Sequence, residues 1–298
     1  MIRTGNIAET SPLDRDLAAL LPFPAAGANK YTRGKLVVVA GCAEYPGAAC
    51  LCATAGQRTG AGYVEVFCAP GTVPIVQAFQ PSLVAQGWTS FEQRTLPAST
   101  SGKPVAYVVG PGFDRADEEC RRLTLFVLEN AHAPVLIDGG ALGILASPEG
   151  RALAKQRFAQ GLPTIITPHA GEAARLMEAS AHAAASQEET ARALASAYGA
   201  IVAAKGPDTF VSDGTRTAIV TNGTPALAKA GTGDVLAGMM GAFLAQGLDP
   251  FDAAMLACAL HAEAGKLAEC ALTSISVIPE DVIEHIPAAI KRLVAAAK

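Results

Sequence analysis

The stretch Ala230-Gly231-Thr232-Gly233-Asp234-Val235-Leu236-Ala237-Gly238 decides the fold and the site of this chain. Apolar residues recur in and after it at helical spacing, so it predicts a glycine-rich turn that opens a helix. The N–H groups of a first helical turn have no partner within the helix, and with the helix dipole they form a site for phosphate oxygens. An acidic residue there is common as a cap, but a cap alone requires neither Gly231 nor Gly233, which both weaken a helix start. The stretch therefore predicts an anion hole at Gly231, Thr232 and Gly233, with Asp234 beside it as a base.

The composition restricts the class of protein. Of 298 residues, 50% are hydrophobic and 17% are charged, which supplies a large buried core and excludes a disordered chain. The net charge of -4 argues against nucleic acid as a partner. No apolar run is long enough to span a membrane, and residues 1–16 lack the order of a signal peptide, so we expect a cytoplasmic protein without a membrane partner. The seven cysteines include no C-x-x-C pair, and we expect core thiols rather than disulfides or zinc ligands.

Strand and helix patterns alternate along almost the whole chain. Continuous apolar runs predict buried strands at residues 36–40, 62–67, 105–109, 135–137, 164–167 and 200–204. Helical patterns lie between and after them, including residues 47–60, 117–130, 187–198, 249–270 and 280–293. Residues 209–212 and 217–220 flank Asp213-Gly214 and predict a β-hairpin. We therefore expect an α/β fold with a mainly parallel sheet, helices on both faces and a C-terminal β-hairpin. No linker divides residues 31–298, which we expect to form one domain after an N-terminal arm of residues 1–30 that carries one short helix.

Unusual residue clusters follow the predicted strands. In open parallel sheets, ligands bind beyond the carboxyl ends of the strands, and polar groups that converge there indicate an enzyme or a ligand-binding protein. A lysine directly after a buried strand can reach a nucleotide phosphate or a carbonyl, although it can also be a solvated strand end. The clusters are Gly110-Pro111-Gly112, Asp138-Gly139-Gly140, Pro168-His169 and Lys205-Gly206.

Three common nucleotide-binding or hydrolase motifs are absent from the sequence. It contains no G-x-x-x-x-G-K-[ST], which excludes a P-loop protein. No G-x-G-x-x-G follows the first predicted strand, which argues against a Rossmann dinucleotide fold. No G-x-S-x-G is present, which excludes the α/β-hydrolases.

Taken together, the motifs of this chain resemble those of the NAD(P)H-hydrate dehydratase family, a branch of the ribokinase-like superfamily. G-T-G-D alone is shared with other ribokinase-like kinases, whereas T-P-H-x-G-E, K-G-x-x-T and A-G-T-G-D-V-L-A-G in this order are far more specific. The chain departs from the family pattern at two places. Ala170 stands where the family often has proline, and Pro207-Asp208 is an unusual pair at the two variable positions of K-G-x-x-T. The resemblance runs from about residue 34 to the C-terminus and is carried by Gly47-Ala48-Ala49, Arg58-Thr59-Gly60-Ala61-Gly62, Val109-Gly110-Pro111-Gly112, Thr167-Pro168-His169-Ala170-Gly171-Glu172, Lys205-Gly206-Pro207-Asp208-Thr209, Leu227-Ala228-Lys229 with residues 230–238, and His261 with Gly265.

The resemblance implies a repair enzyme that dehydrates hydrated NADH or NADPH, with ADP as phosphoryl donor and Mg²⁺ assisting. Phosphorylation of the ring hydroxyl turns it into a good leaving group, and Asp234 would take the hydroxyl proton. The short N-terminal region implies the stand-alone bacterial form, which acts with a separate epimerase and assembles as a homo-oligomer, expected to be a tetramer. It assigns no metal ligands. The positions it implies for the substrate are Ala48, Gly112, His169 and Asp234, and those for ADP are Lys205, Gly206, Pro207, Asp208, Thr209 and Gly233.

Two other functions fit part of the sequence. A ribokinase-like kinase of a thiazole, pyrimidine or pyridoxal alcohol would share the G-T-G-D turn, but Thr167-Pro168-His169 with Gly171-Glu172 favours the dehydratase. A catalytically silent nucleotide-binding regulator would not need Asp234. For His169 itself, a structural role, in which it only hydrogen-bonds the loop before Gly171, competes with contact to the hydrated dinucleotide.

Overall fold

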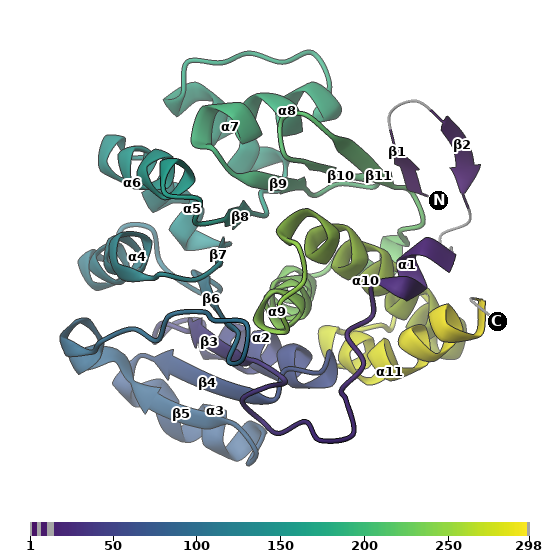
Figure 1. Cartoon of the computed structure of the whole chain (residues 1–298), viewed down its shortest axis with the longest axis horizontal. Helices are drawn as coiled ribbons and strands as arrows, with labels where there is room; N and C mark the ends of the chain where they lie inside the picture. The colour runs from purple at the N-terminus through teal and green to yellow at the C-terminus, as the bar shows by residue number, and fades with distance from the viewer. Residues whose placement is uncertain (1, 5–6, 11–14, 297–298) are drawn as a thin grey trace.

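A mixed sheet of eleven strands lies at the centre of the computed structural model, which describes residues 2–4, 7–10 and 15–296 (Figure 1). Its strand order is β2-β1-β11-β10-β9-β8-β7-β6-β3-β4-β5. Neighbouring strands from β9 to β5 run parallel, whereas β10, β11, β1 and β2 pair antiparallel. The strands are β1 (Ile2–Thr4), β2 (Ile7–Thr10), β3 (Lys35–Val39), β4 (Tyr63–Cys68), β5 (Val84–Gly87), β6 (Val105–Val109), β7 (Val135–Ile137), β8 (Thr164–Ile166), β9 (Ile201–Ala204), β10 (Thr209–Ser212) and β11 (Thr217–Val220).

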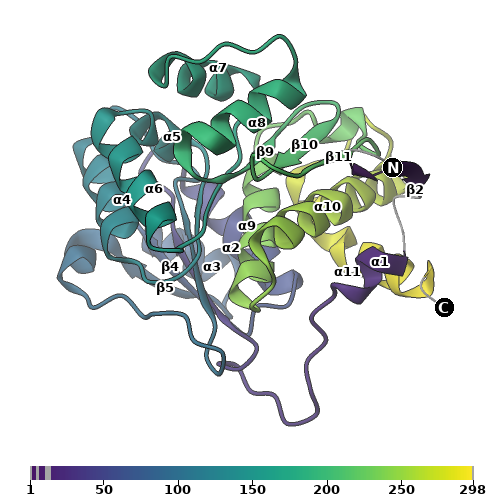
Figure 2. The same cartoon turned by 45° about the horizontal axis from the view of Figure 1, so that its top comes forward.

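Helices cover both faces of this sheet and make a three-layered structure (Figures 1 and 2). One face is covered by α1 (Arg15–Ala19), α2 (Pro46–Arg58), α3 (Val73–Phe79), α9 (Thr232–Ala245), α10 (Pro250–Leu272) and α11 (Pro279–Ala296). The other face is covered by α4 (Glu118–Asn130), α5 (Gly140–Leu145), α6 (Pro148–Ala159), α7 (Ala170–Ala179) and α8 (Gln187–Tyr198). Short 3₁₀ helices occur at Pro70–Thr72, Trp88–Gln93 and Pro225–Leu227.

The central strands are apolar on both faces because each face meets a layer of helices. In β3, Leu36 and Val38 belong to the core cluster on the side of α9, while Val37 and Val39 belong to the cluster on the side of α4. All four are buried. Successive side chains of a strand point to opposite faces, so only an uninterrupted apolar run satisfies both layers.

The structure confirms the α/β class, the mainly parallel sheet with helices on both faces, and the hairpin at residues 209–212 and 217–220. The sequence patterns missed α3 and β5, because β5 is a four-residue edge strand with one exposed and two half-buried residues. They also missed β1, which pairs with β11, and β2, both within the predicted arm. The short helix predicted near Leu17 is α1, while residues 1, 5–6 and 11–14 of that arm lie outside the described residues.

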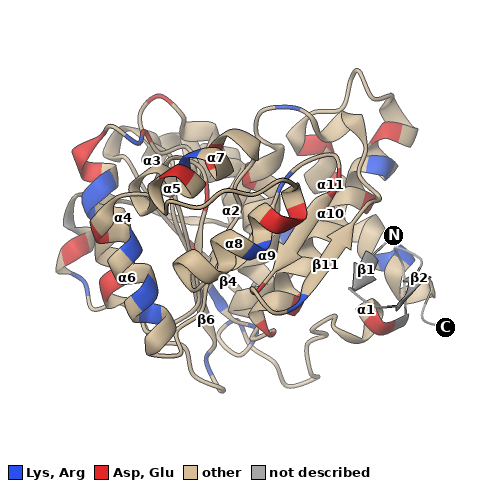
Figure 3. Ribbon diagram, turned by 90° about the horizontal axis from the view of Figure 1, so that it is seen from above, with Lys and Arg blue, Asp and Glu red and all other residues tan. Residues whose placement is uncertain are grey.

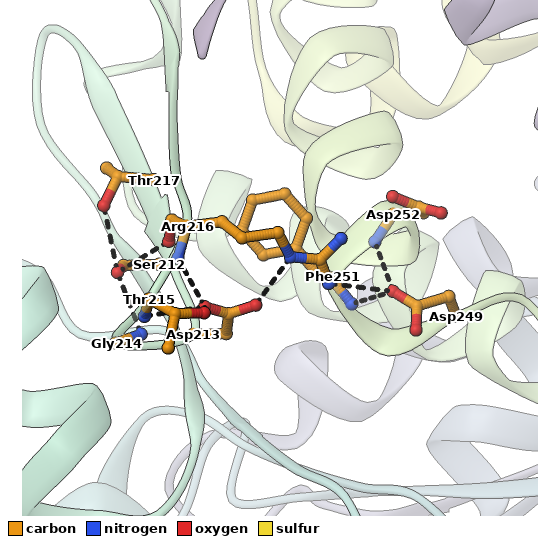
Figure 4. A network of polar contacts seen from close by, with 9 residues as sticks. All are labelled: Ser212, Asp213, Gly214, Thr215, Arg216, Thr217, Asp249, Phe251 and Asp252. Atoms are coloured by element: carbon orange, nitrogen blue, oxygen red, sulfur yellow. Dashed lines mark hydrogen bonds and ion pairs between the residues drawn. The ribbon is translucent and has the colours of Figure 1, made fainter. Parts of the chain in front are cut away.

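The turn of the β10–β11 hairpin is tied to the start of α10 (Figure 4). Asp213 accepts hydrogen bonds from the backbone N–H groups of Thr215 and Arg216, and from Nε of Arg216 at 2.7 Å. The Arg216 guanidinium lies 4.2 Å from the ring centroid of Phe251 and 3.6 Å from Asp249, the N-cap residue of α10. The hairpin is therefore fixed at its turn, while its open end carries residues 205–208 and 221–231.

The outer helices carry interspersed charges of both signs. Basic and acidic residues follow one another along α4 and α6 (Figure 3), and Arg121 of α4 forms an ion pair with Glu149 of α6. No helix in the described part of the chain is long and apolar enough to cross a membrane.

Arg157 of α6 is a buried arginine that joins three elements. Its guanidinium is only 2% exposed and donates to the carbonyl oxygens of Ala131 and Ala133, both at 2.7 Å, and to Oγ1 of Thr164 at 3.1 Å. Burial lowers the pKa of Arg157 to about 10, so the group remains charged at neutral pH. These bonds connect the end of α4 with the starts of β7 and β8.

We predict that Arg157→Leu lowers the free energy of unfolding by about 3 kcal/mol, because several buried carbonyl groups lose their donors. Urea denaturation measures the change. Lys155→Met on the exposed surface of the same helix is the control and should change stability by less than about 0.5 kcal/mol. If Arg157→Leu is as stable as the control, the guanidinium network does not support the fold.

Candidate active site

The start of α9 provides a set of backbone donors at the carboxyl edge of the sheet. Gly231 is its N-cap residue with φ +96°, and a Cβ there would lie 2.7 Å from Cγ of Pro279. Both the left-handed backbone and the close contact require glycine. The Thr232 hydroxyl donates to the carbonyl oxygens of Leu227 at 2.7 Å and Lys229 at 2.9 Å, which closes the turn. The N–H of Gly233 has no acceptor within the helix and remains available for an anion.

Three strand ends meet at the carboxylate of Asp138, which follows β7 and is 3% exposed. Its Oδ1 accepts from Nζ of Lys205, after β9, at 2.8 Å and from Oγ1 of Thr167, after β8, at 2.7 Å. The backbone N–H of Lys205 donates to the carbonyl oxygen of Pro168 at 2.8 Å. A Cβ built on Gly233 would lie 3.5 Å from Nζ of Lys205, so this ammonium group lies next to the start of α9.

The environment of Asp234 favours its protonated form. Burial and the like charge of Asp138 raise the pKa of Asp234 to about 7, against the opposing effect of Lys205. Among the described residues, no hydrogen bond or ion pair reaches the Asp234 carboxylate. For Lys205, burial lowers the pKa, but the carboxylates of Asp138 and Glu172 outweigh burial and raise it above its ordinary value. The site thus pairs a cation that stays charged with a carboxylate that titrates near neutral pH, as a general base requires.

His169 is the N-cap residue of α7. Its Nδ1 accepts from the N–H of Gly171 at 3.0 Å, and Glu172 accepts from the His169 N–H at 2.8 Å, which completes a capping box. The imidazole is nevertheless 58% exposed and borders the cavity described below. The local role considered from the sequence is therefore present. Nε2 of the ring lies 3.5 Å from Oε1 of Glu172, and the ring remains accessible from the cavity.

Ala48 and Gly112 lie together although they are far apart in the sequence. Gly112 has φ +64°, and a Cβ there would lie 2.7 Å from Cβ of Ala48 and 2.6 Å from the carbonyl oxygen of Tyr45. The N–H of Cys42, after β3, donates to the carbonyl oxygen of Gly112, after β6, at 3.0 Å. Larger residues at either position would force these two loops apart.

A cavity of about 780 Å³ opens between the start of α9, the end of β9 and α10. Of the residues singled out from the sequence, those that line it are His169, Lys205, Gly206, Pro207, Thr209, Gly231, Thr232 and Gly233. Ala48, Gly112, Asp208 and Asp234 do not line it. Its other lining residues are Val220, Gly223, Thr224, Pro225, Leu227, Ala228, Lys229, Ala230, Leu236, Cys258, His261 and Ala262.

One residue that supports the site carries no usable signal in the sequence. Gln187, the first residue of α8, holds the loop after β9, because its Nε2 donates to the carbonyl oxygens of Ala204 at 2.9 Å and Asp208 at 3.0 Å. Nothing in the local pattern distinguishes Gln187 from a surface glutamine. His261 was noted as part of a motif, and in the structure it is buried against the cavity, where burial lowers its pKa to about 4 and keeps it neutral.

A phosphate-binding helix start, a lysine and a carboxylate that titrates near neutral pH form a site suited to phosphoryl transfer to a hydroxyl group. Since the catalytic demands of such a transfer are mainly positioning and charge stabilisation, this geometry does not by itself name the acceptor.

Comparison with known proteins identifies the family. The family model described as NAD(P)H-hydrate dehydratase matches residues 36–288. An ADP-dependent (S)-NAD(P)H-hydrate dehydratase from Xanthomonas campestris is 32% identical over 282 residues, which are 91% of this chain and 93% of that protein. A bifunctional NAD(P)H-hydrate repair enzyme from Mycobacterium tuberculosis is 37% identical over 241 residues, but the match covers only 46% of its length.

Solved structures agree with this family. An ADP/ATP-dependent NAD(P)H-hydrate dehydratase from Bacillus subtilis, co-crystallised with ATP/Mg²⁺, superposes with a TM-score of 0.79 at 25% identity and covers 94% of this chain and 97% of its own. A ribokinase-like superfamily protein from Enterococcus faecalis has the same fold, with a TM-score of 0.75 at 22% identity over 97% and 99% of the two chains. The chain therefore belongs to the NAD(P)H-hydrate dehydratase family, a family of lyases with a ribokinase-like fold.

Proposed function

We propose that this chain restores hydrated NADH and NADPH to the reduced cofactors in an ADP-dependent dehydration. The observation that carries the proposal is the position of Asp234. Its carboxylate has no hydrogen-bond partner among the described residues and directly follows Gly233, whose N–H is free. The positive charge of Lys205 also acts on it. The ADP dependence of the Xanthomonas relative supports the choice of nucleotide.

The reaction proceeds in two balanced steps. Asp234 accepts the proton of the ring hydroxyl while the hydroxyl oxygen attacks the terminal phosphorus of ADP, and the bond from that phosphorus to AMP breaks. The Gly233 N–H and the Lys205 ammonium stabilise the charge on the transferring group. The resulting ester then loses phosphate as its C–O bond breaks, and the loss of a proton from the adjacent ring carbon restores the double bond. The products are NAD(P)H, AMP and phosphate.

The two substrates need two adjoining subsites. The cavity has the size of common ligand sites, and its phosphate end is formed by Lys205, Gly231, Thr232 and Gly233. We assign ADP to this cavity, with residues 206–209 beside it. Ala48 lies in the first turn of α2 and the loop that carries Gly112 packs against it. The charge of Asp234 acts on Cys52 of the same helix. We assign the hydrated dinucleotide to this second subsite, with Asp234 between the two substrates and His169 at the rim.

Mg²⁺ belongs to the proposal as part of the nucleotide substrate. The described residues contain no group of three or more His, Cys, Asp or Glu side chains that could hold a metal ion. Mg²⁺ is commonly held by few carboxylates together with substrate phosphates, so a magnesium–ADP complex fits a site without a protein cage. The ion supplies charge stabilisation at the phosphates when bound.

The proposal extends to partners and location. The chain spans about half the length of the bifunctional relatives. On the resemblance alone, we infer that an NAD(P)H-hydrate epimerase acts with it. We also infer a homotetramer, on the resemblance alone. The seven cysteines are free, which fits a reducing compartment such as the cytoplasm.

The purified protein, incubated with hydrated NADH and ADP, should restore the absorbance of reduced nicotinamide, and ADP should support a higher initial rate than ATP. A reaction without protein gives the background. Recovery only with ATP would contradict the assigned donor. Absence of recovery with either nucleotide would contradict the dehydratase function, and formation of a phosphorylated thiazole, pyrimidine or pyridoxal alcohol would favour the kinase instead.

We predict that Asp234→Asn reduces turnover by about 10²–10⁴-fold, because an amide cannot accept the hydroxyl proton. ADP binding, followed by calorimetry, should hardly change, since the backbone donors of α9 remain. Near-normal turnover of the variant would remove Asp234 from the mechanism.

We predict that His169→Ala raises the KM for hydrated NADH more than it lowers kcat, the result of lost ground-state binding. One lost polar hydrogen bond is worth about 1–3 kcal/mol. His182→Ala, an exposed histidine beyond the end of α7, is the matched control and should leave both constants unchanged. A loss of ADP affinity alone, or no kinetic change in a folded variant, would assign His169 to helix capping only.

A further inference from the structure

Asp138 carries a buried negative charge that the proposed mechanism does not use. Its Oδ1 accepts two hydrogen bonds, one from Nζ of Lys205 at 2.8 Å and one from Oγ1 of Thr167 at 2.7 Å. Its backbone N–H donates to the carbonyl oxygen of Val109 at the end of β6, at 3.1 Å. The backbone bond and the two side-chain donors hold this carboxylate in place.

We propose that Asp138 is a positioning residue of the reaction, which holds the Lys205 ammonium beside the start of α9 and keeps it from pairing with Asp234. The inference rests on the proposed function, since it assigns to Lys205 and Asp234 the roles given there. Asp138 itself touches neither substrate in this arrangement, because it is buried behind Lys205 and does not line the cavity.

Lys205 needs such an anchor because several carboxylates compete for it. Asp138, Glu172 and Asp234 all act on its charge, and a lysine side chain is flexible with three donors. Among the described residues, its ammonium group forms an ion pair with Asp138 alone. Without that partner it would move towards Glu172 or Asp234, and a pair with Asp234 would hold the base in its charged, weakly basic form.

The charges around Asp234 fix the sign of the expected change. The groups whose charge interacts with Asp234 are Asp138 after β7, Lys205 after β9 and the thiol of Cys52 on α2. His261 on α10 interacts with Lys205 and is neutral above about pH 4. Glu172 of α7 acts on Lys205. Removing the charge of Asp138 removes a repulsion and leaves the charge of Lys205 unopposed. Both effects lower the pKa of Asp234.

The test is Asp138→Asn, which keeps the size of the side chain and can still bond Thr167. In the wild-type protein, kcat/KM should fall as the pH drops through about 7, because Asp234 becomes protonated and loses its function as a base. In the variant this acid limb should move to lower pH by about one unit. The Kd for ADP, measured by calorimetry without turnover, should rise at least about threefold, because Lys205 is no longer fixed.

Asp213→Asn is the matched control, since it removes the carboxylate of another aspartate–cation pair, at the turn of the hairpin (Figure 4). It should leave the acid limb and the Kd for ADP unchanged. An Asp138→Asn protein that folds with an unmoved acid limb and an unchanged Kd would overturn the inference.

Asp138→Glu separates charge from position and serves if the asparagine variant fails to fold. It restores the negative charge, so the acid limb should stay within about half a unit of wild type, while the longer side chain displaces Lys205 and weakens ADP binding severalfold. Wild-type ADP affinity in this variant would overturn the positioning role. Failure of the proposed function can be told apart from failure of this inference. In the first case the wild-type protein shows no dehydration, while the ADP measurements still test the role of Asp138.

Discussion

The close packing of α9 against α2 and the sheet is the constraint on which the site depends. A Cβ on Gly238 would lie 2.0 Å from the carbonyl oxygen of Cys52, and one on Gly241 would lie 2.4 Å from Cγ2 of Val108. Larger residues at these positions would push the helix away from β6. Because the helix is held so closely, its first turn lies at the carboxyl edge of the sheet, where Asp138 follows β7 and Lys205 follows β9. The packing at Gly238 and Gly241 therefore positions the anion hole at the start of the same helix.

The second constraint is electrostatic. The half-buried edge of the sheet holds one lysine among three carboxylates, Asp138, Glu172 and Asp234, and only Asp138 pairs with it directly among the described residues. Removal of water from these groups strengthens each interaction and makes an unpaired charge costly. Burial and the like charge of Asp138 raise the pKa of Asp234 to about 7, and we propose that the pairing of Lys205 with Asp138 preserves this basicity. Structural ion pairing and the chemistry of the base are thus consequences of one arrangement.

Much of the fold could be read from the sequence because continuous apolar runs and glycine-rich strand ends are local signals. The hairpin was predicted at its observed residues, since Asp213-Gly214 marks its turn. The edge strand β5 gave no such signal, because one of its faces meets solvent. The motif residues of the cavity were also found, but its lining residues Pro225 and Cys258 and the supporting Gln187 were not. Their importance arises from contacts between segments distant in sequence, such as Gln187 with Ala204 and Asp208, which no local pattern contains.

Kinase chemistry in a lyase raises the question of what restricts the acceptor. The start of α9, Lys205 and Asp234 would activate any hydroxyl placed between them, so discrimination must come from the neighbouring subsite. There, the left-handed Gly112 lies against Ala48 and the Tyr45 backbone, and no larger residue fits at Gly112. We propose that these two small residues allow a broad, flat ring to approach the backbone closely. In the arrangement that we propose, the helix start and Asp234 carry out the reaction, and Gly112 and Ala48 select the hydroxyl that reaches them.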